Sequence, residues 1–287
     1  MTDDVPRSQS LISCEELAAA LGESDLCILD ASLHLPATGR DANAEFERGH
    51  IPGARFLHLA SLTDRKSSVP AALANPRDLA ARLADLGVGP ETRIVLYDDS
   101  DIRTSARAWF MLAAHGVTNV AILDGGLVKW RKEGRPLDQG LAPALHAPEL
   151  ALAQTDRVAT KADMLANLDS SREQVLDARS AERVFGSGID PVHGGANGRI
   201  PGALNLPFAK VFAADGTYRS PAELRALFAE AGIDWDRPIV TTCGSGVTAC
   251  VLLFAAHLAG KDDLRLYDGS WLEWEADPAT PKAQGPA

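Results

Sequence analysis

Short runs of mostly apolar residues alternate along the chain with stretches that have the periodicity of helices. Such runs are typical of strands buried on both faces. Short buried strands that alternate with helices predict a mainly parallel sheet covered by helices on both faces, an α/β fold. The strands are predicted at Leu26–Leu29, Arg93–Tyr97, Val120–Leu123, Gln174–Asp177, Ile239–Thr242 and Leu264–Tyr267.

Polar residues mark where several helices begin. Ser13-Cys-Glu-Glu16 and Ser220-Pro-Ala-Glu223 have the spacing of capping boxes, in which the Ser and Glu side chains each accept a backbone N–H. Asn75 precedes Pro76, a residue favoured at the first helical position, and Gly87 follows the helix that they predict. Further helices are predicted at Ser105–His115 and Thr248–Ala259.

The chain contains an internal repeat. Ile-Pro-Gly-Ala occurs at 51–54 and again at 200–203. Three further pairs are each 145 positions apart, namely Asn75 with Ser220, Gly87 with Gly232 and Val95 with Val240. A constant offset through several motifs indicates a duplicated domain.

The repeat divides the chain into two α/β domains. A first domain is predicted over residues 1–138 and a second over 158–287, each with a mainly parallel sheet and helices on both faces. Residues 139–157 are the predicted linker; the Ala- and Pro-rich stretch 137–148 at its start has no regular period. In such sheets ligands bind at the carboxyl ends of strands.

Composition and charge exclude several functions. The net charge of −11 argues against nucleic acid or an anionic membrane surface as a partner. No basic and apolar leader and no membrane-length apolar run is visible. The four cysteines form no CxxC pair and the seven histidines no cluster, which predicts no metal site and free thiols in a reducing cytoplasm.

The most informative segment runs from Ile239 to Cys250. A buried strand leads to Cys243, and the loop Gly244-Ser-Gly-Val-Thr248 then leads into a helix. Two glycines allow a sharp turn that aims backbone N–H groups inward, and the helix N-terminus adds unpaired donors. Such a loop favours a thiolate. We therefore expect Cys243 to be the catalytic nucleophile and to carry a persulfide, with Gly244, Ser245, Gly246, Val247 and Thr248 around the substrate.

Two other positions serve as comparisons for Cys243. Cys250 lies in an apolar helix and is interpreted more readily as a structural core residue than as a resolving thiol, the alternative. Subtracting the repeat offset from Cys243 gives Asp98, which has no thiol and no flanking glycines. The first domain is therefore predicted to be non-catalytic.

These motifs resemble a known family. Cys243-Gly-Ser-Gly-Val-Thr248 is similar to the active-site loop of 3-mercaptopyruvate sulfurtransferases, and the paired Ile-Pro-Gly-Ala motifs resemble signatures of the rhodanese family. Gly269–Trp274 and Leu29–Pro36 are similar to the closing segment and to the first domain of tandem rhodaneses. The resemblance implies two rhodanese-like domains. It also implies a double-displacement reaction that needs no cofactor. The sulfur acceptor would be a small thiol, a thioredoxin-like protein or cyanide.

The resemblance also implies how the sulfur donor binds. Thiosulfate enzymes of the family carry cations in the loop, where this chain has Gly244 and Ser245, so 3-mercaptopyruvate is the favoured donor and thiosulfate the alternative. Arg183 is placed by resemblance as the residue that binds the donor's carboxylate. Arg179 is a second substrate-binding candidate and is more readily interpreted as a structural ion-pair residue.

The chain departs from the family pattern in two places. Mercaptopyruvate enzymes usually have a second arginine before the Ile-Pro-Gly motif. The corresponding residues 189–197 of this chain contain no arginine, and Val192 aligns best with the missing one. His193 in this stretch is an alternative polar contact for the donor and is more readily interpreted as a surface loop residue. A relay of Asp and His to the loop serine is not expected either, because Ala60 and Val69-Pro70 occupy those places.

Two other functions are compatible with a cysteine loop. A cysteine phosphatase needs an arginine six residues after the cysteine to bind phosphate. This chain has Ala249 there, which cannot neutralise phosphate, so the phosphatase interpretation is weak. A persulfide carrier or binding module without turnover would contain the same cysteine and loop as an enzyme, so only turnover separates these two.

Overall fold

The structure is a computed structural model in which residues 10–141 and 145–285 are described. The predicted linker is therefore described only in part, and the N-terminal stretch examined for a leader lies outside the described residues. The chain forms two compact units. Unit 1 comprises the residues up to Thr63, Ala74–Thr155 and Ala214–Tyr218, and unit 2 comprises Asp64–Leu73, Asp156–Ala213 and the residues from Arg219.

Each unit includes a short segment from the other half of the chain. In unit 1, Asp215 pairs with Lys129 at 3.0 Å, and in unit 2 the backbone N–H of Leu73 donates to Asp268 at 2.8 Å. The division into 1–138, 139–157 and 158–287 stays a prediction. The described part of the predicted linker up to Thr155 belongs to unit 1.

The two units have the same sheet topology. The strand order is β1-β5-β4-β2-β3 in unit 1 and β6-β10-β9-β7-β8 in unit 2, and every pair is parallel. This confirms the predicted fold class and the duplication. The strands of unit 1 are β1 (Leu11–Ile12), β2 (Leu26–Asp30), β3 (Arg55–Phe56), β4 (Arg93–Tyr97) and β5 (Val120–Leu123). Those of unit 2 are β6 (Val158–Ala159), β7 (Gln174–Asp177), β8 (Leu204–Asn205), β9 (Ile239–Thr242) and β10 (Leu264–Tyr267).

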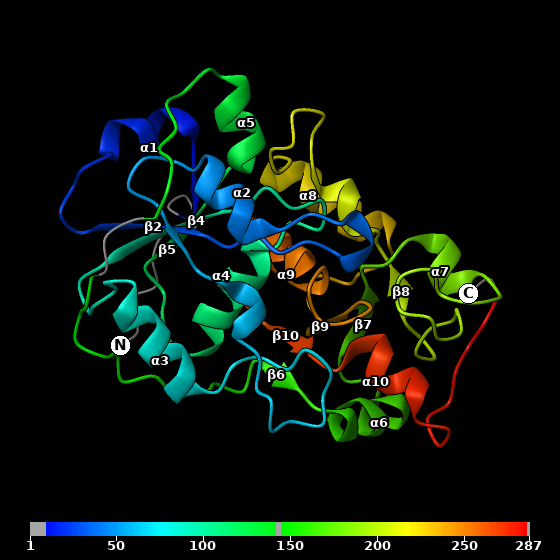
Figure 1. Cartoon of the computed structure of the whole chain (residues 1–287). Coiled ribbons are helices and arrows are strands. Elements are labelled where there is room, and N and C mark those ends of the chain that lie inside the picture. Colours follow the sequence, from blue (N-terminus) through cyan, green and yellow to red (C-terminus); the bar gives the residue numbers. More distant parts are fainter. Residues whose placement is uncertain (1–9, 142–144, 286–287) are drawn as a thin grey trace. The chain divides into compact units, whose positions relative to one another are not determined.

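Helices cover both faces of each sheet, as the apolar strands require. In unit 2, α6 and α10 supply side chains to one core cluster, and α9 contacts β9 and β10 from the other side; Figure 1 shows α6 and α10 beside one another. The helices are α1 (Cys14–Ala20), α2 (Ala42–Arg48), α3 (Pro76–Asp85), α4 (Ser105–Ala114), α5 (Gly126–Lys132), α6 (Lys161–Ser170), α7 (Ala181–Phe185), α8 (Pro221–Glu230), α9 (Ala249–Leu258) and α10 (Ser270–Ala276). Short 3₁₀ turns in the described residues are η2 (Pro36–Thr38), η3 (Leu59–Ser61) and η4 (Phe208–Val211).

The predicted helix starts are confirmed at the level of hydrogen bonds. Ser13 and Ser220 each form a reciprocal capping box with the glutamate three residues later. The Asn75 side chain accepts the N–H of Asp78, with Pro76 at the first helical position. These bonds satisfy N–H groups that a helix leaves unpaired at its first turn.

A buried tryptophan occupies the same place in both units. Trp130 in α5 and Trp274 in α10 are fully buried, and each indole N–H donates at 2.8 Å to a proline carbonyl, of Pro136 and of Pro281. The bond attaches the segment after the last helix to the core. A tryptophan needs such a partner because its indole N–H would otherwise be buried unpaired.

Replacing either tryptophan by phenylalanine should therefore destabilise its own unit. We expect Trp130→Phe and Trp274→Phe each to lower the free energy of unfolding by about 1–2 kcal/mol, from the lost hydrogen bond and the smaller ring. Trp235→Phe is the control, because the half-buried Trp235 packs on Phe228 and its indole N–H has no hydrogen-bond partner among the described residues. Urea unfolding followed by circular dichroism measures all three, and equal losses for the three variants would contradict the prediction.

Candidate active site

The carboxyl ends of three neighbouring strands converge in unit 2. Asp177 ends β7, Cys243 directly follows β9, and Tyr267 ends β10. Parallel strands bring their carboxyl ends to one edge of the sheet, and the loops that follow them form the ligand site. The predicted nucleophile therefore lies at the edge where this fold binds ligands.

The backbone of Cys243 is held by the start of α10. Its N–H donates to the Ser270 hydroxyl at 3.1 Å, and its carbonyl accepts the Trp271 N–H at 3.0 Å. Ser270 has a left-handed conformation with φ of 52°, and its hydroxyl donates in turn to the carbonyl of Tyr267 at 2.9 Å. Because both its N–H and its carbonyl are hydrogen-bonded, the backbone of Cys243 is fixed. Only 2% of the surface of the residue is exposed.

The predicted loop turns tightly between β9 and α9. Gly246 has φ of 77°, a conformation that glycine adopts without strain. Its carbonyl accepts the Cys250 thiol at 3.2 Å. Cys250 is completely buried in α9, in agreement with its predicted structural place. Ser245, Val247 and Thr248 are half-buried at the rim of the loop.

Arg179 is enclosed in the protein. Its side chain is 0% exposed, and its guanidinium donates to Asp177 at 2.7 Å and to the carbonyl of Gly198 at 2.6 Å. Its guanidinium carbon also lies 4.8 Å from the centre of the Trp271 ring. The structure thus places Arg179 behind the site rather than on its surface.

Arg183 in α7 faces the site and pairs with Asp190. Nε and Nη2 of Arg183 donate to the two carboxylate oxygens of Asp190 at 3.0 and 2.7 Å, and 17% of the arginine side chain is exposed. Burial raises the pKa of Asp190, but the bonds from Arg183 and from the N–H of Val192 outweigh it and hold that pKa below its usual value. The carboxylate is therefore charged at neutral pH.

His193 lies against the cysteine loop, in contrast to the surface position predicted for it. A Cβ placed on Gly244 would lie 2.1 Å from Nε2 of His193 and 3.2 Å from Nη2 of Arg183. The imidazole is half-buried. Burial, and then the charge of Arg183, lower the pKa of His193, so the ring is neutral at neutral pH.

The first unit has an internal carboxylate where the second has its thiol. Asp98 follows β4 and accepts the N–H groups of Ser100 at 2.9 Å and Ser105 at 2.8 Å. Its carbonyl accepts the Leu127 N–H, as that of Cys243 accepts the N–H of Trp271. A buried anion thus satisfies the N–H groups after β4, which illustrates the preference of this strand-to-helix junction for anions.

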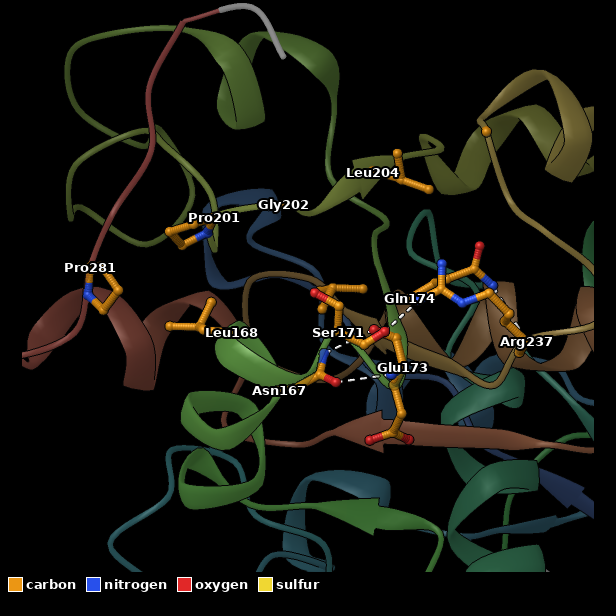
Figure 2. Close-up of a pocket in the computed structure, with 12 residues that line it drawn as sticks. Asn167, Leu168, Ser171, Glu173, Gln174, Pro201, Gly202, Leu204, Arg237 and Pro281 are labelled. Carbon is orange, nitrogen blue, oxygen red and sulfur yellow. Dashed lines mark hydrogen bonds between the residues drawn. The ribbon is translucent and has the colours of Figure 1, made fainter.

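A cavity in unit 2 is not part of this site. It has a volume of about 580 Å³ and lies beside the amino end of β7, near Gln174 and Arg237. Figure 2 shows that the polar side chains there bond to the protein, for example Asn167 to the backbone of Glu173. In the described part of the chain, no group of three or more histidines, cysteines or carboxylates could hold a metal ion.

Asp190 and Ser270 were not identified from sequence, and His193 was considered there only as the less favoured alternative. Asp190 and His193 lie in a loop without periodicity, and Ser270 has a role that depends on its left-handed backbone. The repeat contains one usable signal for Ser270, because the serine stands where the first half has Gly126 in the motif Leu123-Asp-Gly-Gly126.

The comparisons with known proteins agree on one family. Residues 13–133 and 160–277 each match the rhodanese-like domain. The 3-mercaptopyruvate sulfurtransferase of Mus musculus is 40% identical over 93% of this chain and 92% of its own length. The thiosulfate sulfurtransferase of Bos taurus is 37% identical over 91% of this chain and 89% of its own.

A solved structure matches the fold as well. The crystal structure of SseA from Escherichia coli, described as a 3-mercaptopyruvate sulfotransferase, superimposes with a TM-score of 0.81. It is 33% identical and covers 92% of this chain and 99% of its own.

Ser270 provides a test of how the backbone of Cys243 is held. In Ser270→Ala the buried N–H of Cys243 loses its acceptor, which should lower the free energy of unfolding of unit 2 by about 1–3 kcal/mol. Ser187→Ala is the matched control, because Ser187 is exposed and its hydroxyl has no hydrogen-bond partner among the described residues. If thermal or urea unfolding leaves Ser270→Ala as stable as the control, the hydroxyl does not hold this backbone.

Proposed function

We propose that this chain, which belongs to the rhodanese family, is a sulfurtransferase that takes sulfur from 3-mercaptopyruvate through a persulfide on Cys243. One observation carries the proposal: Cys243 lies at the carboxyl end of β9 in a glycine loop that leads into α9. In the proposal unit 2 is catalytic and unit 1 is not.

The first half-reaction transfers one sulfur atom to the enzyme. The Cys243 thiolate attacks the thiol sulfur of the donor, an S–S bond forms, and the C–S bond of the donor breaks. The electron pair of that bond stays with the carbon as the enolate of pyruvate. The donor thiol loses its proton, and one proton adds to the enolate to give pyruvate. The enzyme is left with a persulfide. The loop N–H groups and the start of α9 stabilise its negative terminal sulfur.

The second half-reaction regenerates the thiolate. A thiolate acceptor, from a small thiol or a thioredoxin-like protein, attacks the outer sulfur and leaves with it as a new persulfide. Cyanide takes the same sulfur as thiocyanate. In both cases the S–S bond of the enzyme breaks and its electron pair returns to Cys243, so neither half needs a cofactor.

Arg183 is the proposed contact of the donor's carboxylate. A guanidinium has five N–H donors, of which Asp190 accepts one from Nε and one from Nη2. The end of the guanidinium thus keeps three N–H groups, enough for a bidentate contact with a carboxylate. We propose that Arg179, which is enclosed by Asp177, Asp190 and Trp271, positions these elements and does not touch the donor.

The charge of the site supports a donor with one negative charge. Arg179 and Arg183 are balanced by Asp177 and Asp190, and the side chains of Gly244 and Ser245 add no charge. Thiosulfate, the alternative donor and the one in the name of the bovine relative, is a dianion. A site without net positive charge favours the monoanion 3-mercaptopyruvate.

The cellular location is also a proposal. None of the described helices is long and apolar enough to cross a membrane. We propose a reducing compartment such as the cytoplasm, because a persulfide enzyme needs its thiol reduced and the four cysteines are free. One relative is named as mitochondrial.

The assignment of the nucleophile is tested by mass. After treatment with 3-mercaptopyruvate and removal of the excess, the wild-type protein should gain the mass of one sulfur atom, and Cys243→Ser should gain none and lose turnover. Cys250→Ser is the matched control, because replacement of the buried Cys250 is expected to leave most activity intact. Sulfur that still adds to Cys243→Ser would refute the assignment, and a persulfide without steady-state turnover would favour a carrier.

Donor choice is tested by charge in the loop. We expect a higher kcat/KM for 3-mercaptopyruvate than for thiosulfate, with cyanide as the common acceptor. Ser245→Lys adds a cation at the half-buried rim and should move the ratio about tenfold or more toward thiosulfate, the scale of a charge-assisted bond. Ser245→Ala controls for loss of the hydroxyl. A wild-type enzyme that already prefers thiosulfate would overturn the charge argument.

A further inference from the structure

We infer that His193 contacts the sulfur donor and that, with Arg183, it forms a subsite for the carboxylate and carbonyl oxygens of a 2-oxo acid. The inference rests on the proposed function and adds to it a residue that contacts the donor. His193 contributes an N–H donor from one side of Gly244, and Arg183 contributes its guanidinium from the same side.

Gly244 shows that the two side chains meet beside the nucleophile. The space that a Cβ of Gly244 would fill is occupied by the imidazole of His193, with Nε2 at 2.1 Å and Cδ2 at 2.4 Å, and by Nη2 of Arg183 at 3.2 Å. Gly244 is bonded directly to Cys243 in the chain. A donor whose sulfur reaches Cys243 can therefore extend past Gly244 toward both groups.

Asp190 fixes both groups in this position. One carboxylate oxygen accepts the N–H of Val192 at 2.8 Å and that of His193 at 3.3 Å, and both oxygens bind Arg183. The carboxylate is buried, with 1% of the residue exposed. The histidine loop and the arginine are thus attached to one rigid anchor, so the contact does not depend on a mobile loop.

The ring nitrogens of His193 are available for a ligand. Neither nitrogen has a hydrogen-bond partner among the described residues, although the ring is half-buried. A half-buried polar group next to a nucleophile is typical of a binding site. Because burial and Arg183 lower the pKa of His193, the ring supplies one N–H donor without a second positive charge.

This combination suits a 2-oxo carboxylate. The guanidinium end of Arg183 matches a planar carboxylate, and a neutral N–H suits a carbonyl or a carboxylate oxygen. Thiosulfate has no carboxylate and no carbonyl. The subsite therefore predicts that His193 matters for 3-mercaptopyruvate and for pyruvate, and much less for thiosulfate.

The experiment separates substrate contact from mere packing on Gly244. His193→Ala should raise KM for 3-mercaptopyruvate about threefold to tenfold, the scale of one neutral hydrogen bond, with kcat changed less than about twofold. Its kcat/KM for thiosulfate should stay within about twofold of the wild type. His193→Gln keeps an N–H donor and should restore most of the affinity for 3-mercaptopyruvate.

Two variants of neighbouring residues strengthen the test. Val192→Ala shortens the exposed side chain before His193 and should leave both donors unaffected, which controls for disturbance of the loop. Gly244→Ala introduces a Cβ that must displace the imidazole and should raise KM for 3-mercaptopyruvate at least as much as His193→Ala.

Pyruvate binding, measured by NMR titration, tests the subsite without turnover. The dissociation constant of pyruvate should rise about threefold or more in His193→Ala. Equal losses on both donors, or unchanged KM and unchanged pyruvate binding, would overturn the inference and leave the proposed function intact. If the wild type does not turn over 3-mercaptopyruvate but pyruvate binding depends on His193, the proposed function fails and the subsite stands.

Discussion

The site depends on one buried carboxylate, that of Asp190. It pairs with Arg183, lies 3.6 Å from Nη1 of Arg179 and accepts two backbone N–H groups from its own loop. Removing one partner of a buried ion pair leaves an uncompensated charge, at a cost of about 3–5 kcal/mol. Together with Asp177, which pairs with Arg179, Asp190 thus makes it possible to hold two arginines close to an enzyme thiol without a net positive charge that would attract every anion.

The duplication shows how the same sheet can be reactive or inert. In unit 2 the residue after β9 is a cysteine between Thr242 and Gly244, and in unit 1 the residue after β4 is Asp98, whose carboxylate already accepts the N–H groups that follow. Strand order and helix packing are the same in both. Fold stability therefore constrains the strands and helices, and the chemistry is decided by a few residues in the loops after them.

The sequence predicts what is local and misses what depends on contacts between distant loops. The long apolar strands and the capping boxes were predicted because their signals lie within a few neighbouring residues. The two-residue edge strands β1, β3, β6 and β8 are too short to give a pattern. Cys243 was recognisable from the two glycines in the loop after it, whereas His193 was considered as a polar contact but interpreted as a surface residue. Its contact with Gly244 spans 51 positions and depends on the turn that Asp190 organises, which periodicity does not reveal.

Trp271 explains why residues from separate loops can keep one geometry. Its backbone N–H donates to the carbonyl of Cys243, its indole N–H donates to the carbonyl of Ala196 at 2.8 Å, and its ring lies against Arg179. Ala196 follows the histidine loop, so one buried side chain in α10 connects that loop, the cysteine and the buried arginine. A subsite built from the segments that follow β7, β9 and β10 needs such a connection, because a displacement of 1 Å is enough to separate a hydrogen-bond donor from its acceptor. The closing segment of unit 2 therefore does more than pack in the core. It sets the distance between the nucleophile and the groups that are proposed to hold its substrate.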